Sequence, residues 1–165
     1  MLNDTDEPWH GALLLSRERL DGDTLARLTV EVSVEPRTVT PIALSDELSK
    51  PDDPIAEIVV ARLEDLTRVH TFVEDIELAY EPDLLEVRVM EAEDGYAVTV
   101  TARSLARDVT LQVDQAAEDA TVDDALITLT AGESRTFHVR TTAHNIGQAL
   151  TRPPVLRSAN DLQHA

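Results

Sequence analysis

The stretch VTVTARSLARDVTL, which begins at Val98, constrains the fold of this chain more than any other. Its apolar residues occupy even positions from Val98 to Ala102 and odd positions at Val109 and Leu111. Alternation with a period of two is typical of half-buried β-strands. The change of parity predicts that the chain is interrupted at residues 103–106, either by a reactive loop or by a corner between two strands of a sandwich.

The composition favours strands in a chain without membrane segments. Hydrophobic residues make up 42% of the 165 residues but aromatic residues only 3%, so the core must be built mainly from Val, Leu, Ile and Ala. No apolar run approaches the ~20 residues of a membrane helix, and the opening MLNDTDEPWH has no signal-peptide pattern. We therefore expect a cytoplasmic protein with no membrane partner.

The charge balance limits the partners further. Thirty-two acidic residues against 14 basic ones give a formal charge of −18, which repels phosphate backbones and argues against binding to nucleic acid. The absence of cysteine excludes disulfides, thiolate zinc sites and a cysteine nucleophile. The five histidines show no zinc spacing, and five glycines are too few for a phosphate loop, so we expect no metal and no cofactor.

The first half of the chain contains strand patterns separated by turns. An apolar run, GALLLS, and the alternating LARLTVEVSV flank the turn DGD at residues 21–23, which predicts a hairpin. The inward face of its second strand would carry Leu28, Val30, Val32 and Val34. Because proline has no N–H to donate to a sheet ladder, Pro41 indicates that the next apolar segment is an edge strand or an irregular segment. Further along, we predict a solvated loop at 45–54, a buried strand rather than a helix at 58–63, and a strand around 69–73.

The second half follows the break EPD at residues 81–83 and contains a strong hairpin signature. Alternating residues at 85–89 and 96–100 flank a turn, Glu93-Asp94-Gly95. Beyond it we predict a strand through Val109, Leu111 and Val113, an acidic loop at 114–124, and strands around 125–130 and 137–139. We therefore predict an all-β chain of two tandem antiparallel sandwiches, residues 1–80 and 81–142. Residues 143–165 form a tail that is docked or mobile.

Candidate chemical groups are weak. The acidic pairs Asp52-Asp53, Glu91 with Glu93, and Asp123-Asp124 lie in predicted turns, where acidic residues are favoured for their turn chemistry rather than for catalysis. The loop 119–124 offers oxygen ligands but does not match the spacing of a calcium loop. Ser134 in AGES has no base that can be named, and His138 is predicted to face outward from a strand.

Trp9 is a candidate for carbohydrate binding, because an exposed indole can stack on a sugar ring. It is the only tryptophan in the chain. The alternative is an anchor in a core or an interface, which is the more frequent role of a lone large aromatic side chain.

Two segments of the second half carry a resemblance to a known family. EVRVMEAEDGYAVTVTARSLARDVTLQVD, followed by DDALITLTAGESRTFHVRT, resembles the C-terminal immunoglobulin-like domain of bacterial β-mannosidases of glycoside hydrolase family 2. The family pattern D-x-x-x-x-L-x-x-G-E-x-R-T is matched by Asp124, Leu129, Gly132, Glu133, Arg135 and Thr136. The first half is similar to the sandwich that precedes this domain in those enzymes.

The resemblance implies two immunoglobulin-like sandwiches and a corner, not a reactive loop, at residues 103–106. The catalytic glutamates of the family lie on a (β/α) barrel that would precede Met1, so no residue here inherits a catalytic role. The expected function is that of an inactive C-terminal fragment of an enzyme that hydrolyses terminal β-linked mannose. It would support the catalytic barrel, its expected partner, or assembly of the oligomer, and it would self-associate through orphaned apolar surface.

Two other functions remain open from the residues. The sandwich architecture and Trp9 are compatible with a carbohydrate-binding module, and the same architecture is compatible with a stand-alone interaction or adhesion domain.

Overall fold

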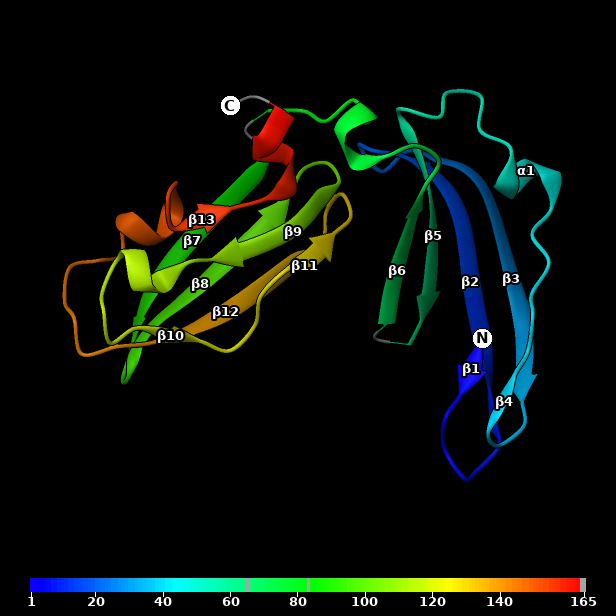
Figure 1. Cartoon of the computed structure of the whole chain (residues 1–165), viewed down its shortest axis with the longest axis horizontal. Helices are drawn as coiled ribbons and strands as arrows, with labels where there is room; N and C mark the ends of the chain where they lie inside the picture. Colours follow the sequence, from blue (N-terminus) through cyan, green and yellow to red (C-terminus); the bar gives the residue numbers. More distant parts are fainter. Residues whose placement is uncertain (65, 83, 164–165) are drawn as a thin grey trace. The chain divides into compact units, whose positions relative to one another are not determined.

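A computed structural model describes residues 1–64, 66–82 and 84–163, and the side chains of all of these except 162 and 163. Asp83, in the predicted break, and His164 lie outside the described residues. The chain forms two compact units, one of Met1–Arg19 with Asp23–Leu78, and one of Leu20–Gly22 with residues from Ala79 onward. The four sheets are antiparallel throughout (Figure 1), which confirms the predicted all-β architecture of two tandem sandwiches.

The first unit contains a four-stranded sheet in the order β3-β2-β5-β6. Its strands are β2 (Trp9–Arg19), β3 (Thr24–Val34), β5 (Glu57–Leu63) and β6 (Leu66–Thr71), and a separate short ladder joins β1 (Leu2–Asn3) to β4 (Thr38–Val39). The predicted hairpin is confirmed: β2 and β3 pair from Trp9↔Val34 to Glu18↔Thr24. Gly22 turns the chain between them at φ 95°, a conformation that glycine adopts without steric cost.

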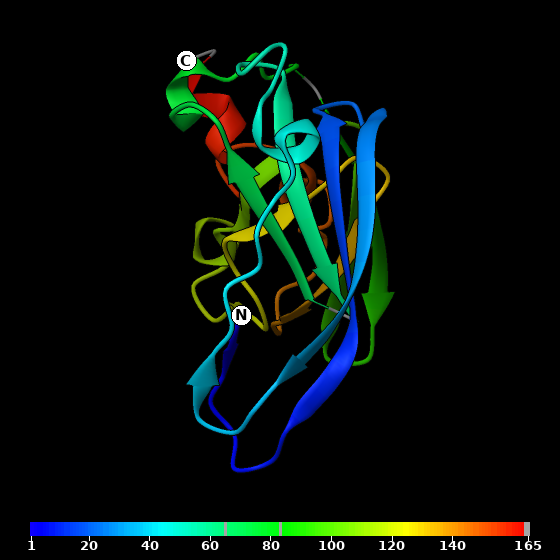
Figure 2. The ribbon, with the colours of Figure 1, turned by 90° about the vertical axis from the view of Figure 1, so that its right-hand side faces the viewer.

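The segment predicted as a solvated loop contributes to the layer that covers the sheet of this unit. That segment contains α1 (Asp46–Ser49), and its Leu48 is 1% exposed, so the expectation of a wholly solvated loop is wrong. Leu48 packs with Leu13 and Val34, because one apolar face of the sheet needs a cover and the β1–β4 ladder is too short to supply it. Figure 2 shows the segment that carries α1 passing over the sheet.

Strand β3 is buried less than its alternation predicts. Val32 and Val34 are buried as expected, but Leu28, on the same face, is 38% exposed. The reason is that β3 is an edge strand, so an inward-pointing side chain has a neighbouring strand on one side only.

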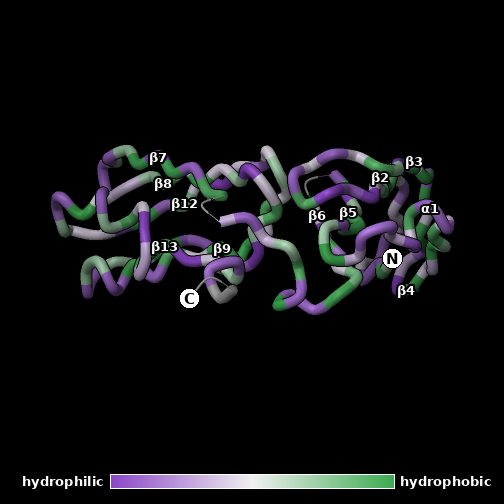
Figure 3. Tube along the Cα trace, turned by 90° about the horizontal axis from the view of Figure 1, so that it is seen from above, coloured by the Kyte–Doolittle hydropathy of each residue, from purple (hydrophilic) through white to green (hydrophobic). Residues whose placement is uncertain are grey.

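The second unit is a sandwich of a four-stranded and a three-stranded sheet. The first has the order β10-β12-β8-β7, with β7 (Leu85–Ala92), β8 (Gly95–Ala102), β10 (Thr121–Val122) and β12 (Ser134–Arg140). The second has the order β11-β9-β13, with β9 (Ala106–Leu111), β11 (Ile127–Leu129) and β13 (Leu156–Arg157). Hydrophobic and hydrophilic residues alternate along β7 (Figure 3), as the predicted hairpin requires. Val98, Val100 and Phe137 are fully buried in the core.

The interruption after Ala102 is a corner between the two sheets. Strand β8 ends there in the four-stranded sheet, and β9 begins at Ala106 in the three-stranded one, so the predicted sandwich corner is confirmed. The change of parity occurs later than predicted, because Ala106 is still buried and the extra residue lies within β9. Ile127 pairs with Val109 but Leu129 with Ala106, and this bulge contains Asp108 at φ 52°.

Two boundaries in the second unit differ from the expectation, and the tail takes the docked one of its two predicted alternatives. The strand predicted to continue through Val113 ends at Leu111, and a 3-10 helix follows at Val113–Gln115. The predicted acidic loop contains β10, which pairs with β12. In the tail, Leu150, Val155 and Leu156 are buried, and β13 pairs with β9. Within the described residues no helix has the length and apolar character to cross a membrane.

Candidate functional site

Trp9, the predicted sugar-binding candidate, lies at the start of β2 and is partly buried. It packs against the core cluster that contains Leu13 and Val34. A Cβ added at Gly11 would lie 2.5 Å from Cζ2 of the indole, so the ring covers the strand at the position where β2 has no side chain. The placement gives Trp9 an apolar packing role, and the structure brings no other predicted site residue to it.

A buried ion pair joins β2 to β5. Arg17 Nη1 donates to Glu57 Oε2 at 2.9 Å and to the Lys50 carbonyl at 2.9 Å. The backbone N–H groups of Asp52 and Asp53 donate to the same carboxylate, and Glu57 is 1% exposed. The carboxylate is therefore occupied by a guanidinium and two amides, and the pair attaches the 50–53 segment to the sheet.

A second polar cluster lies on the opposite face of the same sheet. Ser16 Oγ donates to Glu18 Oε1 at 2.5 Å, and Arg62 Nη1 donates to the same oxygen at 2.7 Å. Ser16 and Glu18 are almost fully buried, and with Leu14, Thr24 and Arg27 they line a pocket of about 230 Å³. Because the carboxylate is shared between a hydroxyl and a guanidinium, the cluster is a satisfied polar network rather than a nucleophile with a free base.

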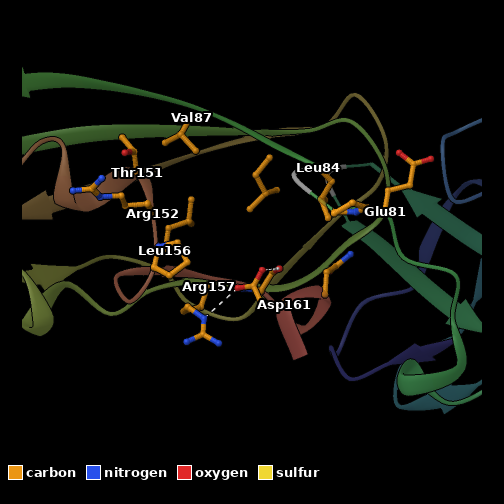
Figure 4. A pocket seen from close by; sticks show the side chains of 13 residues that line it. Glu81, Leu84, Val87, Thr151, Arg152, Leu156, Arg157 and Asp161 are labelled. Carbon is orange, nitrogen blue, oxygen red and sulfur yellow. Dashed lines mark hydrogen bonds and ion pairs between the residues drawn. The ribbon is translucent and has the colours of Figure 1, made fainter. Parts of the chain in front are cut away.

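The second unit contains a groove of about 510 Å³ between β7 and the C-terminal segment. Val87 lies on one side of the groove and Leu156 on the other (Figure 4), and Leu85 and Pro153 also line it. Its charged groups include Arg157, whose Nε donates to Asp161 Oδ2 at 3.1 Å. Glu81 and Arg152 also line the groove, so it combines apolar walls with charged side chains, and among the described residues no histidine lines it.

The acidic loop considered for calcium uses its carboxylates internally. Asp119 accepts hydrogen bonds from the backbone N–H of Thr142 and from the hydroxyls of Thr142 and Thr141. These bonds, the backbone one first, lower the pKa of Asp119 from 3.8 to about 2. Asp123 accepts from the His138 backbone N–H at 2.9 Å. In the part of the chain that the structure describes, no three acidic or histidine side chains gather as metal ligands.

The polar residues of the matched family pattern serve the fold. Glu133 accepts from the Thr130 backbone N–H at 2.9 Å, and Arg135 forms an ion pair with Asp124 at 2.6 Å. Thr136 bonds to Thr99 across the β8–β12 ladder at 2.9 Å. The pattern therefore specifies a turn and the strand that follows it.

The neighbours of this pattern are equally structural. The Ser134 hydroxyl is hydrogen-bonded to the Thr101 hydroxyl at 2.7 Å, which leaves it without a general base. His138 faces outward from β12, as predicted. Gly132 has φ 81°, the left-handed conformation that the turn before β12 requires.

Comparison with known proteins agrees with this geometry. Residues 80–162, half of the chain, match the profile of the immunoglobulin-fold domain of mannosidases. The chain belongs to this family. The resemblance predicted from the sequence is thereby confirmed for the immunoglobulin-like region, and the match includes most of the predicted tail.

The fold of this mannosidase immunoglobulin-fold chain also resembles a solved enzyme. A β-D-mannosidase from Dictyoglomus thermophilum matches with a TM-score of 0.66 and 15% sequence identity, over 95% of this chain and 19% of the enzyme. The chain thus spans about a fifth of that protein. No individually curated protein matches the sequence.

Sequence reasoning missed two polar groups that organise the two units. Arg17 shares the inward parity of Leu13 and Leu15, and a charged residue at such a position is a signal of a buried ion pair. Asn160, 2% exposed, bonds to the backbone of the corner before β9. Nothing in the aperiodic tail sequence marks Asn160 as buried.

Proposed function

We propose that this chain is a non-catalytic accessory region of a β-mannosidase, an enzyme that hydrolyses terminal β-linked mannose, and that it supports the catalytic barrel of that enzyme. The observation that carries the proposal is the fold match, in which nearly the whole chain corresponds to 19% of a β-mannosidase. The chain resembles a part of that enzyme in fold, and residues 80–162 match the immunoglobulin-fold domain of mannosidases, so both comparisons support the proposal.

The distribution of polar groups supports an accessory role. The buried carboxylates Glu18 and Glu57 are bound to arginines, and the loop carboxylates of Asp119 and Asp123 accept backbone hydrogen bonds. Hydrolysis of a glycoside needs two carboxyl groups that face a sugar, one as acid and one as base or nucleophile. Carboxylates committed to the fold stabilise a rigid support instead.

Activity measurements on the isolated chain test the part of this proposal that says the chain is non-catalytic. We expect no release of the aryl group from an aryl β-mannoside above the rate in buffer, at enzyme concentrations up to about 100 μM. Turnover that co-purifies with the folded chain would contradict a non-catalytic role.

The supporting role needs the longer protein. We expect the reading frame upstream of Met1 to encode a (β/α) barrel, and we expect removal of residues 1–165 to lower the thermal midpoint of that barrel and its mannosidase activity together. A frame without a barrel, or a truncated enzyme with unchanged midpoint and activity, would refute the proposal. A matched control removes the same number of residues from the opposite end of the parent.

A further inference from the structure

Strand β3 is an unusually long edge strand. It has 11 residues and pairs with β2 on one side, and within the described residues it has no ladder partner on the other. An exposed edge strand presents unpaired N–H and C=O groups, which natural proteins protect with proline, lysine, bulges or short strands. The segment TLARLTVEVSV contains neither proline nor lysine, and its pairing with β2 is regular from Ala26 to Val34.

Two apolar side chains of this edge strand are exposed. Leu25 and Leu28, on opposite faces of β3, are 37% and 38% exposed. Thr29 lies between the charged residues of the outward face and is exposed as well. A second strand laid along β3 would cover both leucines and satisfy the free backbone groups.

The charges of β3 are arranged for pairing with an identical strand. Arg27 and Glu31 lie on the same face, two residues either side of Thr29, and neither forms an ion pair among the described residues. In an antiparallel pairing with Thr29 on a two-fold axis, Arg27 lies opposite the partner subunit's Glu31. The symmetry repeats that contact, so the interface contains two complementary ion pairs.

The same charges disfavour other symmetric registers. A shift of the axis to residue 27 would bring two arginines together, and a shift to residue 31 would bring two glutamates together. Like charges directly opposite each other destabilise a ladder, so the sequence favours the register centred on Thr29. In that register Leu28 lies opposite the partner subunit's Val30 on the other face.

We propose that β3 is a dimer interface, where two copies of this chain pair antiparallel across a two-fold axis at Thr29 and join their first-unit sheets into one sheet of eight strands. The pairing does not depend on the proposed function, because it uses only residues of β3. Each chain carries a net charge of −18, so the dimer forms best at moderate salt, where repulsion between distant charges is screened within about 10 Å.

The test measures the mass of the full chain by sedimentation equilibrium in 0.15 M salt. We expect a concentration-dependent rise from 18.2 kDa to twice that mass. Arg27→Glu and Glu31→Arg should each weaken dimerisation roughly tenfold or more, because each variant replaces two attractive contacts with two repulsive ones. The matched control Arg88→Glu makes the same charge change on exposed β7 of the other unit and should leave the dimer unchanged.

The decisive measurement mixes the two variants. Arg27→Glu and Glu31→Arg carry opposite charges at the facing positions, so an equimolar mixture should form a heterodimer about as strong as the wild-type dimer. The double variant should also recover self-association. Circular dichroism confirms that each variant is folded. A wild-type chain that stays at 18.2 kDa up to about 1 mM, or folded variants whose mixture stays monomeric, would overturn the proposal.

Discussion

The side-chain amide of Asn160 donates to the carbonyl of Leu105 at 2.8 Å, across 55 residues of sequence. Its oxygen accepts the backbone N–H of Arg107 at 3.0 Å, so one side chain holds both ends of the segment where the chain enters β9. The corner that interrupts the strand alternation is thus closed by a residue of the C-terminal segment. This contact links the least regular part of the sequence to the feature that defines the sandwich.

Asn160→Ala should destabilise the chain by about 2–3 kcal/mol, because it leaves a buried carbonyl and a backbone N–H without partners. Urea unfolding followed by circular dichroism measures the change. Gln148→Ala, an exposed substitution in the same C-terminal segment, serves as the control and should stay within about 0.5 kcal/mol of the wild type. Equal stability of the two variants would show that the Asn160 contacts contribute nothing.

Glu57→Gln should cost about 3 kcal/mol, since it keeps the shape of the side chain but leaves the buried guanidinium of Arg17 without its main counter-ion. Chemical denaturation again reports the loss. Asp46→Asn removes an ion pair with Lys50 whose two side chains are 79% and 71% exposed, and should change stability by no more than about 0.5 kcal/mol. The interpretation fails if the two variants lose similar amounts.

Gly95→Ala should be among the most damaging single substitutions in the second unit. Gly95 has φ 145°, and an added Cβ would lie 2.1 Å from the Val139 carbonyl oxygen in the neighbouring strand. We expect a loss of about 3 kcal/mol or more. Gly132→Ala, at φ 81° with no atom within 4 Å of the added Cβ, should cost only about 1 kcal/mol. Thermal unfolding of both variants distinguishes backbone conformation from steric overlap.

The second unit should lose stability in acid as Asp119 becomes protonated. Its pKa is lowered from 3.8 to about 2, so its stabilising contribution is complete above about pH 3.8 and is lost as the pH falls towards 2. NMR titration of the Asp119 carboxylate should give a midpoint near 2. The free energy of unfolding of Asp119→Asn should depend less on pH between 2 and 4 than that of the wild type. A midpoint at the ordinary value would refute the role of the Thr141 and Thr142 bonds.

Sugar binding at Trp9 can be tested directly by fluorescence, because it is the only tryptophan. Since the indole packs against the first-unit core and covers Gly11, we expect no change in emission with mannan oligosaccharides at millimolar concentration. A saturable change in emission would instead favour the carbohydrate-binding function. Calorimetry should then detect sugar binding by the wild-type chain and none by Trp9→Phe.

Elements with local signals were predictable from the sequence. The β2–β3 hairpin follows from an apolar run and an alternating segment on the two sides of a glycine turn, and β7–β8 follows from alternation on both sides of the turn at Gly95. The buried strand β5 follows from its run of branched apolar residues. In these segments neighbouring residues provide both the strands and the turn, so no distant part of the chain is needed to define them.

Elements that depend on distant partners were not predictable. Leu48 is buried because a sheet face formed by β2 and β3 needs a cover, and its surrounding sequence is polar and charged. Strand β10 has two residues, and its ladder partner β12 lies beyond a turn. The bulge at Asp108 shifts the parity within β9, whereas the alternation alone places the shift several residues earlier.

The sequence by itself determined that the chain is all-β, where its main hairpins turn, and to which family its second half is similar. Period-two alternation and turn residues are local properties, and the amino-acid order carries them in full. Tertiary structure alone decided which charges are buried in pairs, which loop covers a sheet, and which segment closes the corner. Those outcomes depend on desolvation and hydrogen bonding between residues far apart in the chain, such as Asn160 and Leu105.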